Sequence, residues 1–167
     1  GWGVFALATI VYLCTIEPTA SFWDCGEFIA SAYKLEVGHP PGAPFFMLLA
    51  RFLMVFSTPE TAAVFANALS ALSSSFTILF LFWSITHLAK KFATTDNEDL
   101  SVSQTWAVLG SGAVGALVYT FSDSFWFSAV EGEVYALSSL FTALVFWAIL
   151  KWESVADEPG NLRWILV

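Results

Sequence analysis

The residues best suited to chemistry begin with two carboxylates, Asp24 and Glu27. If their segment is helical, both share a face with Ser31 and Lys34, within an arc of about 80°. Such a pair can supply a general base together with a neighbour that tunes its pKa or binds a metal. The alternative is that both carboxylates only solvate an amphipathic helix, where Asp24 near the N-terminus is favoured by the helix dipole.

A second acidic group, Glu131 and Glu133, stands at the start of an apolar run. Ionisable groups at membrane depth are costly and are usually functional. Glu131 and Tyr135 are also i,i+4 neighbours on one helix face. The two glutamates are therefore candidates for a functional role, with Tyr135 beside Glu131. Ordinary solvation of a helix end is the competing interpretation.

Between residues 17 and 61, positive charge is available from Lys34, His39 and Arg51. Of these, His39 could contact a phosphate. His39 stands between Gly38 and a double proline, a setting equally typical of a simple turn.

The composition predicts a membrane protein. Of the 167 residues, 57% are hydrophobic and 12% are charged, with a mean hydropathy of +0.72. A soluble domain carries about 25% charged residues, so this chain needs lipid to cover its apolar surface. The net charge of −8 argues against a nucleic-acid partner, which requires a basic surface.

Apolar runs near the length of about 20 residues that crosses a bilayer predict the elements. The chain ends as another run begins, so we expect it to be a fragment of a larger protein. The predicted spans are 2–16, 62–89, 105–121 and 134–152, with the start of another at 162–167.

The lysines predict the orientation. Lys90 and Lys91 close one span and Lys151 closes another, and basic residues favour the cytoplasmic side. Residues 17–61 and 122–132 then form two external segments on the opposite side. In the first we expect interfacial helices at about 23–37 and 44–56, because the latter is too short to cross a bilayer and contains Arg51.

The order of these features resembles the N-terminal part of the GT-C membrane glycosyltransferases. It is closer to a bacterial family, formerly of unknown function, that is related to an animal transmembrane O-mannosyltransferase. The resemblance covers nearly all of the chain. It rests on Ser21-Phe22-Trp23-Asp24-Cys25-Gly26-Glu27-Phe28, Gly38-His39-Pro40-Pro41-Gly42-Ala43-Pro44 and Glu131-Gly132-Glu133-Val134-Tyr135.

The resemblance implies an all-α, polytopic, GT-C-like helix bundle. Its implied activity is transfer of a mannose-like sugar from a polyprenyl-phosphate donor to a hydroxyl of a protein or glycan, on the periplasmic or ER-lumenal face. Asp24 is the expected base. The expected cations for the leaving phosphate are Lys34, His39 and Arg51. Glu131, Glu133 and Tyr135 are the other expected substrate-binding residues, and the two glutamates are candidate metal ligands. Protein O-mannosyltransferases have an adjacent acidic pair, whereas here Glu27 follows Asp24 by three positions, so the choice between these two stays open. No cofactor is certain, and a divalent metal ion is the candidate.

Two other functions compete with this one. A transporter or lipid flippase would also hold carboxylates at membrane depth, but its expected mark is a span broken by glycine or proline. The runs 62–89, 105–121 and 134–152 contain no proline. A non-catalytic membrane scaffold would make the clustering of acids accidental.

Overall fold

The computed structural model describes residues 1–21, 23–40, 42–94, 99–158 and 161–164, and these residues form helices and no strand. This confirms the predicted all-α helix bundle. The helices are α1 (Trp2–Cys14), α2 (Cys25–Lys34), α3 (Pro44–Met54), α4 (Ala62–Ala93), α5 (Val102–Thr120), α6 (Asp123–Val130), α7 (Val134–Glu153) and the short 3₁₀ helix η1 (Asn161–Trp164).

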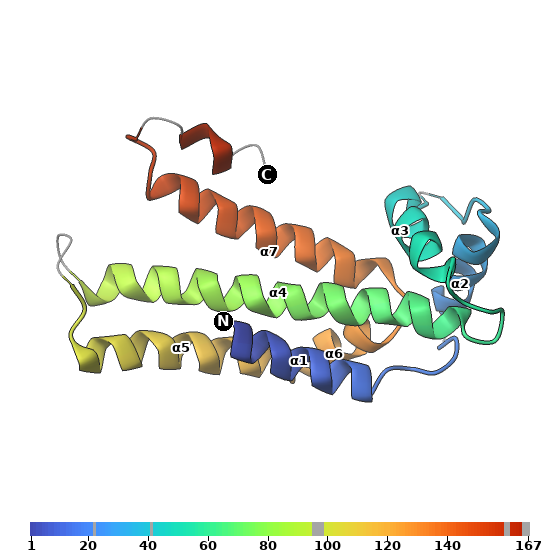
Figure 1. Ribbon diagram of the computed structural model, residues 1–167, viewed down its shortest axis with the longest axis horizontal. Coiled ribbons are helices and arrows are strands. Elements are labelled where there is room, and N and C mark those ends of the chain that lie inside the picture. Colours follow the sequence, from blue (N-terminus) through green and yellow to red (C-terminus); the bar gives the residue numbers. More distant parts are fainter. Residues whose placement is uncertain (22, 41, 95–98, 159–160, 165–167) are drawn as a thin grey trace.

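Helix α4 is the axis of the molecule, with α1 and α5 along one side and α7 along the other (Figure 1). Its 32 residues make it about 48 Å long at 1.5 Å per residue, longer than the ~30 Å hydrocarbon core of a bilayer. Small residues such as Ala66, Ser70 and Ala71 are buried along it. Such residues let neighbouring helices approach closely.

Two helices, α4 and α7, are long and apolar enough to cross a membrane. Helix α5 qualifies only together with α6, as a broken span bent by 67°. The predicted external segment 122–132 thus contains a helix, α6, that the sequence did not predict. Helices α1 and α3 are apolar but shorter. Of the stretch 162–167, residues 162–164 lie in η1 and 165–167 lie outside the described residues.

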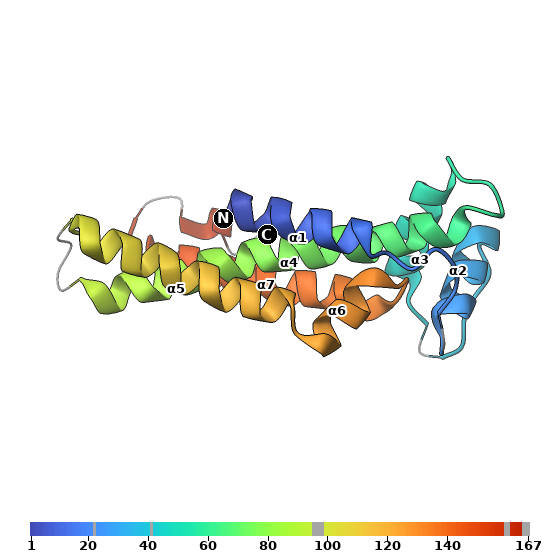
Figure 2. The same cartoon turned by 90° about the horizontal axis from the view of Figure 1, so that it is seen from below.

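Helices α2 and α3 pack together at one end of α4 (Figures 1 and 2). The predicted apolar face of α2, formed by Cys25, Ile29 and Ala32, is buried against this lobe. Ser31 is buried too, so the polar arc predicted for this helix is only partly exposed. Helix α2 ends at Lys34, because Leu35 adopts a left-handed conformation with φ 57°.

Candidate functional site

The turn after α2 brings His39 to the two carboxylates of that helix. The backbone N–H of His39 donates to Glu27 Oε1 at 2.6 Å, and its Nδ1 lies 3.0 Å from Glu27 Oε2. The other ring nitrogen, Nε2, lies 4.0 Å from Asp24 Oδ2. The imidazole is therefore held between both acids by the predicted turn.

Two glycines make this turn possible. A Cβ at Gly38 would lie 3.1 Å from Glu27 Oε1, so the carboxylate would have to shift by a few tenths of an ångström. Gly42 has a φ of +72°, which favours glycine. Its N–H donates to the carbonyl of His39 at 2.8 Å and closes the turn.

The contact between Glu27 and His39 shifts both groups toward their charged forms. The hydrogen bond from the His39 backbone, followed by that from its ring, lowers the pKa of Glu27. The hydrogen bond and charge of Glu27 raise the pKa of His39, with a smaller contribution from Asp24. The pair therefore favours an imidazolium beside two carboxylates.

The second acidic group lies in the turn between α6 and α7 and is buried. Glu131 is 3% exposed and Glu133 is 9% exposed, so these residues do not simply solvate a helix end. The Ser21 hydroxyl donates to the Glu131 carboxylate. The N–H of Glu17 donates to the carbonyl of Val130 at 3.0 Å. These bonds attach the segment after α1 to the end of α6.

Asn67, which is fully buried on α4, joins the segments that carry the acids. Its amide donates to the carbonyls of Glu17 at 2.6 Å and of Thr19 at 3.1 Å. On its other side, Gly132 approaches so closely that an added Cβ would lie 2.8 Å from Asn67 Oδ1. Asn67 thus bonds to the segment before α2 and lies close against Gly132 of the Glu131–Glu133 turn.

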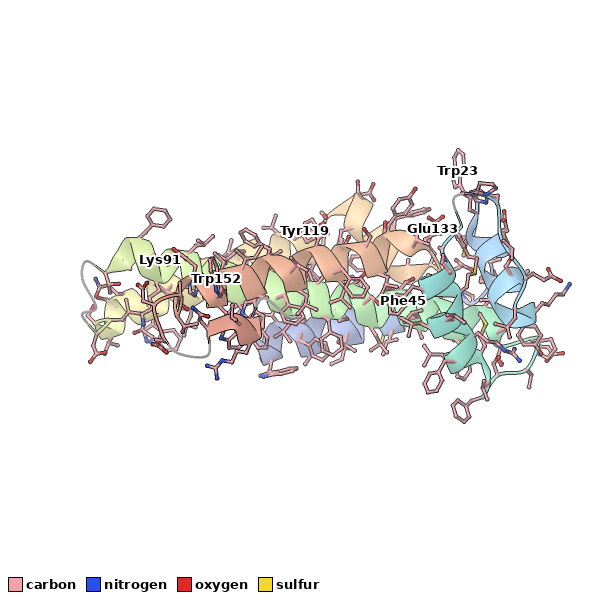
Figure 3. All side chains as sticks on the ribbon, turned by 90° about the horizontal axis from the view of Figure 1, so that it is seen from above. Trp23, Phe45, Lys91, Tyr119, Glu133 and Trp152 are labelled. Carbon is pink, nitrogen blue, oxygen red and sulfur yellow. The ribbon has the colours of Figure 1, made fainter. Side chains whose placement is uncertain are left out.

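A cavity of about 270 Å³ brings Asp24 of the first acidic group together with Glu131 and Glu133 of the second. Figure 3 shows Trp23 and Glu133 at the same end of the bundle. The cavity is near the lower end of the ~300–1,000 Å³ range of ligand pockets, a size suited to one small ring. Its lining is Trp23, Asp24, Phe127, Ser128, Glu131, Glu133 and Tyr135.

The cavity holds its glutamates in an unfavourable setting for negative charge. Burial raises the pKa of Glu131. Burial also raises the pKa of Glu133, and the nearby carboxylates of Glu131 and Asp24 raise it further. Carboxyl groups with raised pKa values beside a solvent-accessible carboxylate are typical of functional sites.

The remaining predicted basic residues make other contacts. The ammonium of Lys34 lies 3.9 Å from the Glu36 carboxylate. Arg51 donates from Nη1 to the carbonyl of Tyr33 at 2.6 Å and lies over the Tyr33 ring, which joins α3 to α2. His39 is therefore the predicted basic residue that the structure brings to Asp24.

Two groups of residues offer ligand atoms for a metal ion. Asp24, Glu27 and His39 each present an atom within 4.8 Å of the others. The predicted candidates Glu131 and Glu133 line the cavity together with Asp24. Two carboxylates and an imidazole suit divalent ions such as Mn²⁺ or Zn²⁺.

Sequence reasoning did not single out Trp23 or Asn67 for the site. Trp23 is 87% exposed and has a left-handed φ of 66°, a strained conformation that occurs often at functional sites. Its position beside Asp24 was the available signal. Asn67 had been interpreted as part of a polar stripe for helix packing, and only the fold shows its partners.

Comparison with known proteins gives the family. A protein O-mannosyl-transferase tmem260 of Dictyostelium discoideum is 28% identical over 145 residues, 85% of this chain and 16% of that protein. Protein O-mannosyl-transferase TMEM260 of Mus musculus is 28% identical over 161 residues, 95% of this chain and 20% of that protein. The chain thus spans at most about a fifth of their length. No solved structure matches it significantly.

The family model that matches is that of the protein O-mannosyl-transferase TMEM260 N-terminal domain, and it covers residues 24–167. The matched range begins at Asp24 and contains Glu27, His39 and the Glu131–Glu133 turn. The chain belongs to the family of the protein O-mannosyl-transferase TMEM260 N-terminal domain.

Proposed function

We propose that this chain is the N-terminal part of a GT-C-type, multi-pass membrane glycosyltransferase. The enzyme transfers a mannose-like sugar from a polyprenyl-phosphate donor to a protein serine or threonine hydroxyl. The observation that carries the proposal is the cavity in which Asp24 meets Glu131 and Glu133. The family's named O-mannosyl-transferases support the reaction class.

Asp24 acts as the general base. An acceptor hydroxyl is a weak nucleophile, so its proton passes to a carboxylate as its oxygen attacks the anomeric carbon. The bond between that carbon and the phosphate oxygen breaks, and its electron pair leaves with polyprenyl phosphate. With 58% of its side chain exposed, Asp24 lies at the edge of the cavity, where an acceptor from outside can reach it.

His39 stabilises the leaving phosphate. Glu27 holds its ring in place and favours the imidazolium, whose positive charge complements the charge that develops on the phosphate. Glu27 is thus a positioning residue in this scheme. A divalent ion bound at Asp24, Glu27 and a neutral His39 would supply this positive charge in place of the imidazolium.

The remaining residues of the cavity hold the sugar. Burial raises the pKa values of Glu131 and Glu133, and a carboxyl group in either protonation state can accept hydrogen bonds from sugar hydroxyls. Tyr135 adds a phenol, and the exposed ring of Trp23 offers an apolar face to the sugar. An apolar wall with a few placed polar groups is usual for ligand sites.

The site faces the non-cytoplasmic side in this proposal. Lys90, Lys91 and Lys151 close α4 and α7 at the opposite end, and the positive-inside rule assigns that end to the cytoplasm. Helices α1, α4 and α7 and the bent pair α5–α6 are the spans, while α2 and α3 lie at the outer interface. The acceptor and the donor sugar then meet in the periplasm or the ER lumen.

The test is a transfer assay on the full-length protein with a polyprenyl-phosphate mannose donor. Asp24→Asn keeps the shape of the side chain but cannot accept a proton, so we expect transfer to fall by about 10²–10⁴, with normal expression and membrane insertion. Full activity of Asp24→Asn would reject Asp24 as the base. A wild-type protein that moves the lipid across a bilayer without transferring sugar would favour the flippase.

A further inference from the structure

A second polar cavity, of about 630 Å³, lies at the opposite end of the bundle from the acidic site, between α4, α5 and α7. In Figure 3, Lys91 and Trp152 mark this end, and Trp23 and Glu133 mark the other. The cavity is lined by Trp83, Thr86, His87, Lys90, Lys91, Thr94, Val108, Trp147, Lys151 and Ser154.

The lining is positively charged. Three of the chain's six lysine and arginine residues belong to it. The Glu153 carboxylate pairs with Lys91 and offsets one of these charges. The ammonium of Lys151 lies 5.8 Å from the ring centroid of Trp147, which holds it beside the wall of the cavity. The charge and the size of the space fit an anionic group of ligand dimensions.

His87 provides a further polar atom. Its Nε2 is buried and has no hydrogen-bond partner in the part of the chain that the structure describes. A buried polar atom without a partner costs about 1–3 kcal/mol, and such atoms in native proteins often bond to a ligand or water. An anion oxygen in the cavity would satisfy it.

The cavity's position indicates where the anion comes from. Lys90 and Lys91 are in the last turn of α4, and Lys151 is in the last turn of α7, the two helices that qualify as spans by themselves. Basic residues at the ends of such spans are typical of the membrane–water boundary. Apolar side chains of α7 just before Lys151, including Val145 and Ile149, are exposed and can lie along acyl chains.

We propose that this cavity binds the phosphate of an anionic membrane phospholipid. Basic pockets between membrane helices recognise acidic headgroups in this way. Lys90 and Lys151 contact the phosphate as point charges, and His87 Nε2 bonds to one of its oxygens. The site is separate from the acidic cavity and does not depend on the proposed transferase reaction.

The test compares lipids on the full-length protein in detergent, by native mass spectrometry. Purified protein is titrated with phosphatidylglycerol or with phosphatidylcholine. We expect phosphatidylglycerol to bind at least tenfold more tightly, and the double variant Lys90→Gln with Lys151→Gln to lose that preference, at about fivefold per lysine. Equal binding of the two lipids by the wild type would overturn the proposal.

Two control variants distinguish lipid binding in this cavity from general attraction between the lipid and positive charge. Arg163→Gln removes the same charge from a residue that does not line the cavity, so phosphatidylglycerol binding should stay unchanged. The double variant Lys90→Arg with Lys151→Arg keeps both charges. It should still bind phosphatidylglycerol, which checks that substitution at these positions leaves the region folded. A loss in Arg163→Gln equal to that in the glutamine double variant would contradict the proposal.

The phosphate could also belong to a soluble molecule. Inorganic phosphate at millimolar concentration is therefore added as a competitor to the protein with bound phosphatidylglycerol. We expect it not to displace the lipid, because it lacks acyl chains. Complete displacement would reject a membrane lipid as the ligand and assign the cavity to a soluble phosphate.

Discussion

The two ends of α4 use ionisable residues differently. At one end, Asp24, Glu131 and Glu133 surround a cavity whose lining contains no basic residue, and both glutamates are buried. At the other end, Lys90 and Lys91 are exposed, Lys151 is half-buried, and Lys91 pairs with Glu153. Like charges that are buried together oppose folding, so the two glutamates do not stabilise the acidic end through their charges.

The ends also differ in how they are built. The basic end is formed by the last turns of two long helices and an adjoining face of α5. The acidic end joins the segment after α1, the start of α2 and the α6–α7 turn, and Asn67 connects them. Its geometry therefore depends on a few polar contacts between distant parts of the chain.

Removing the charge of Glu133 should affect activity most strongly among the following changes. Burial raises the pKa of this carboxyl group, so its ionised form opposes folding at neutral pH. We expect Glu133→Gln to stabilise the protein by about 0.5–2 kcal/mol. The variant loses the hydrogen bond between the Glu133 carboxylate and the sugar. A bond to a charged group is worth about 1.5–3 kcal/mol, so kcat/KM for transfer should fall by about 10–100-fold.

The matched control is Glu153→Gln at the basic end. This residue is exposed and pairs with Lys91, and exposed ion pairs contribute little to stability, so stability should change little and transfer should stay unchanged. Thermal unfolding and kcat/KM measure both variants. A fully active Glu133→Gln protein would show that the buried acids do not serve the reaction.

Asn67→Ala should destabilise the acidic end. The substitution leaves the carbonyls of Glu17 and Thr19 without their donor, at a cost of about 1–3 kcal/mol. Ser74→Ala is the control, because Ser74 is buried on the same helix and its hydroxyl has no partner in the described residues. We expect Ser74→Ala to be neutral or slightly stabilising in thermal unfolding. Equal stability of the two variants would contradict the connecting role of Asn67.

Much of the fold follows from local patterns. The apolar run 134–152 corresponds to α7 within one residue, and the run 62–89 corresponds to α4, which continues to Ala93. The bend of 67° between α5 and α6 was not predictable in this way. No glycine or proline marks the break at Phe121 and Ser122, and the local signal is Ser122, the N-cap of α6, because serine is a favoured N-cap residue.

The candidate site was predictable only in part. The turn at His39 and the two acidic groups could be predicted from the sequence, because prolines and glycines indicate turns and carboxylates indicate charge by residue type alone. Whether Glu131 and Glu133 are solvated or buried depends on what covers them, and the sequence left both options open. The hydrogen bond from Asn67 to Glu17 joins residues 50 positions apart, and helical periodicity cannot predict a contact at that separation.

The smallest expected effect concerns the pH range of the acidic end. The raised pKa of His39 means that its charged form contributes below its usual value of 6.5, and that this contribution is lost as pH rises through the raised value. The lowered pKa of Glu27 means that its contribution is present above 4.5 and is lost as pH falls through the lowered value. The stabilising contributions of both groups are therefore fully present from about pH 4.5 to 6.5, and one of them decreases on each side of this range.

Glu27→Gln removes the largest cause of the raised pKa of His39 and leaves the weaker effect of Asp24. The imidazolium should then lose its proton at lower pH, and the alkaline limb of the kcat/KM profile for transfer should move to lower pH. Glu36→Gln is the control, because Glu36 pairs with Lys34 and should leave the profile in place. If Glu27→Gln lowers activity equally at every pH, Glu27 acts in the reaction itself, as the alternative choice of base requires. An unchanged profile and unchanged activity would remove Glu27 from the site and leave His39 positioned by its turn alone.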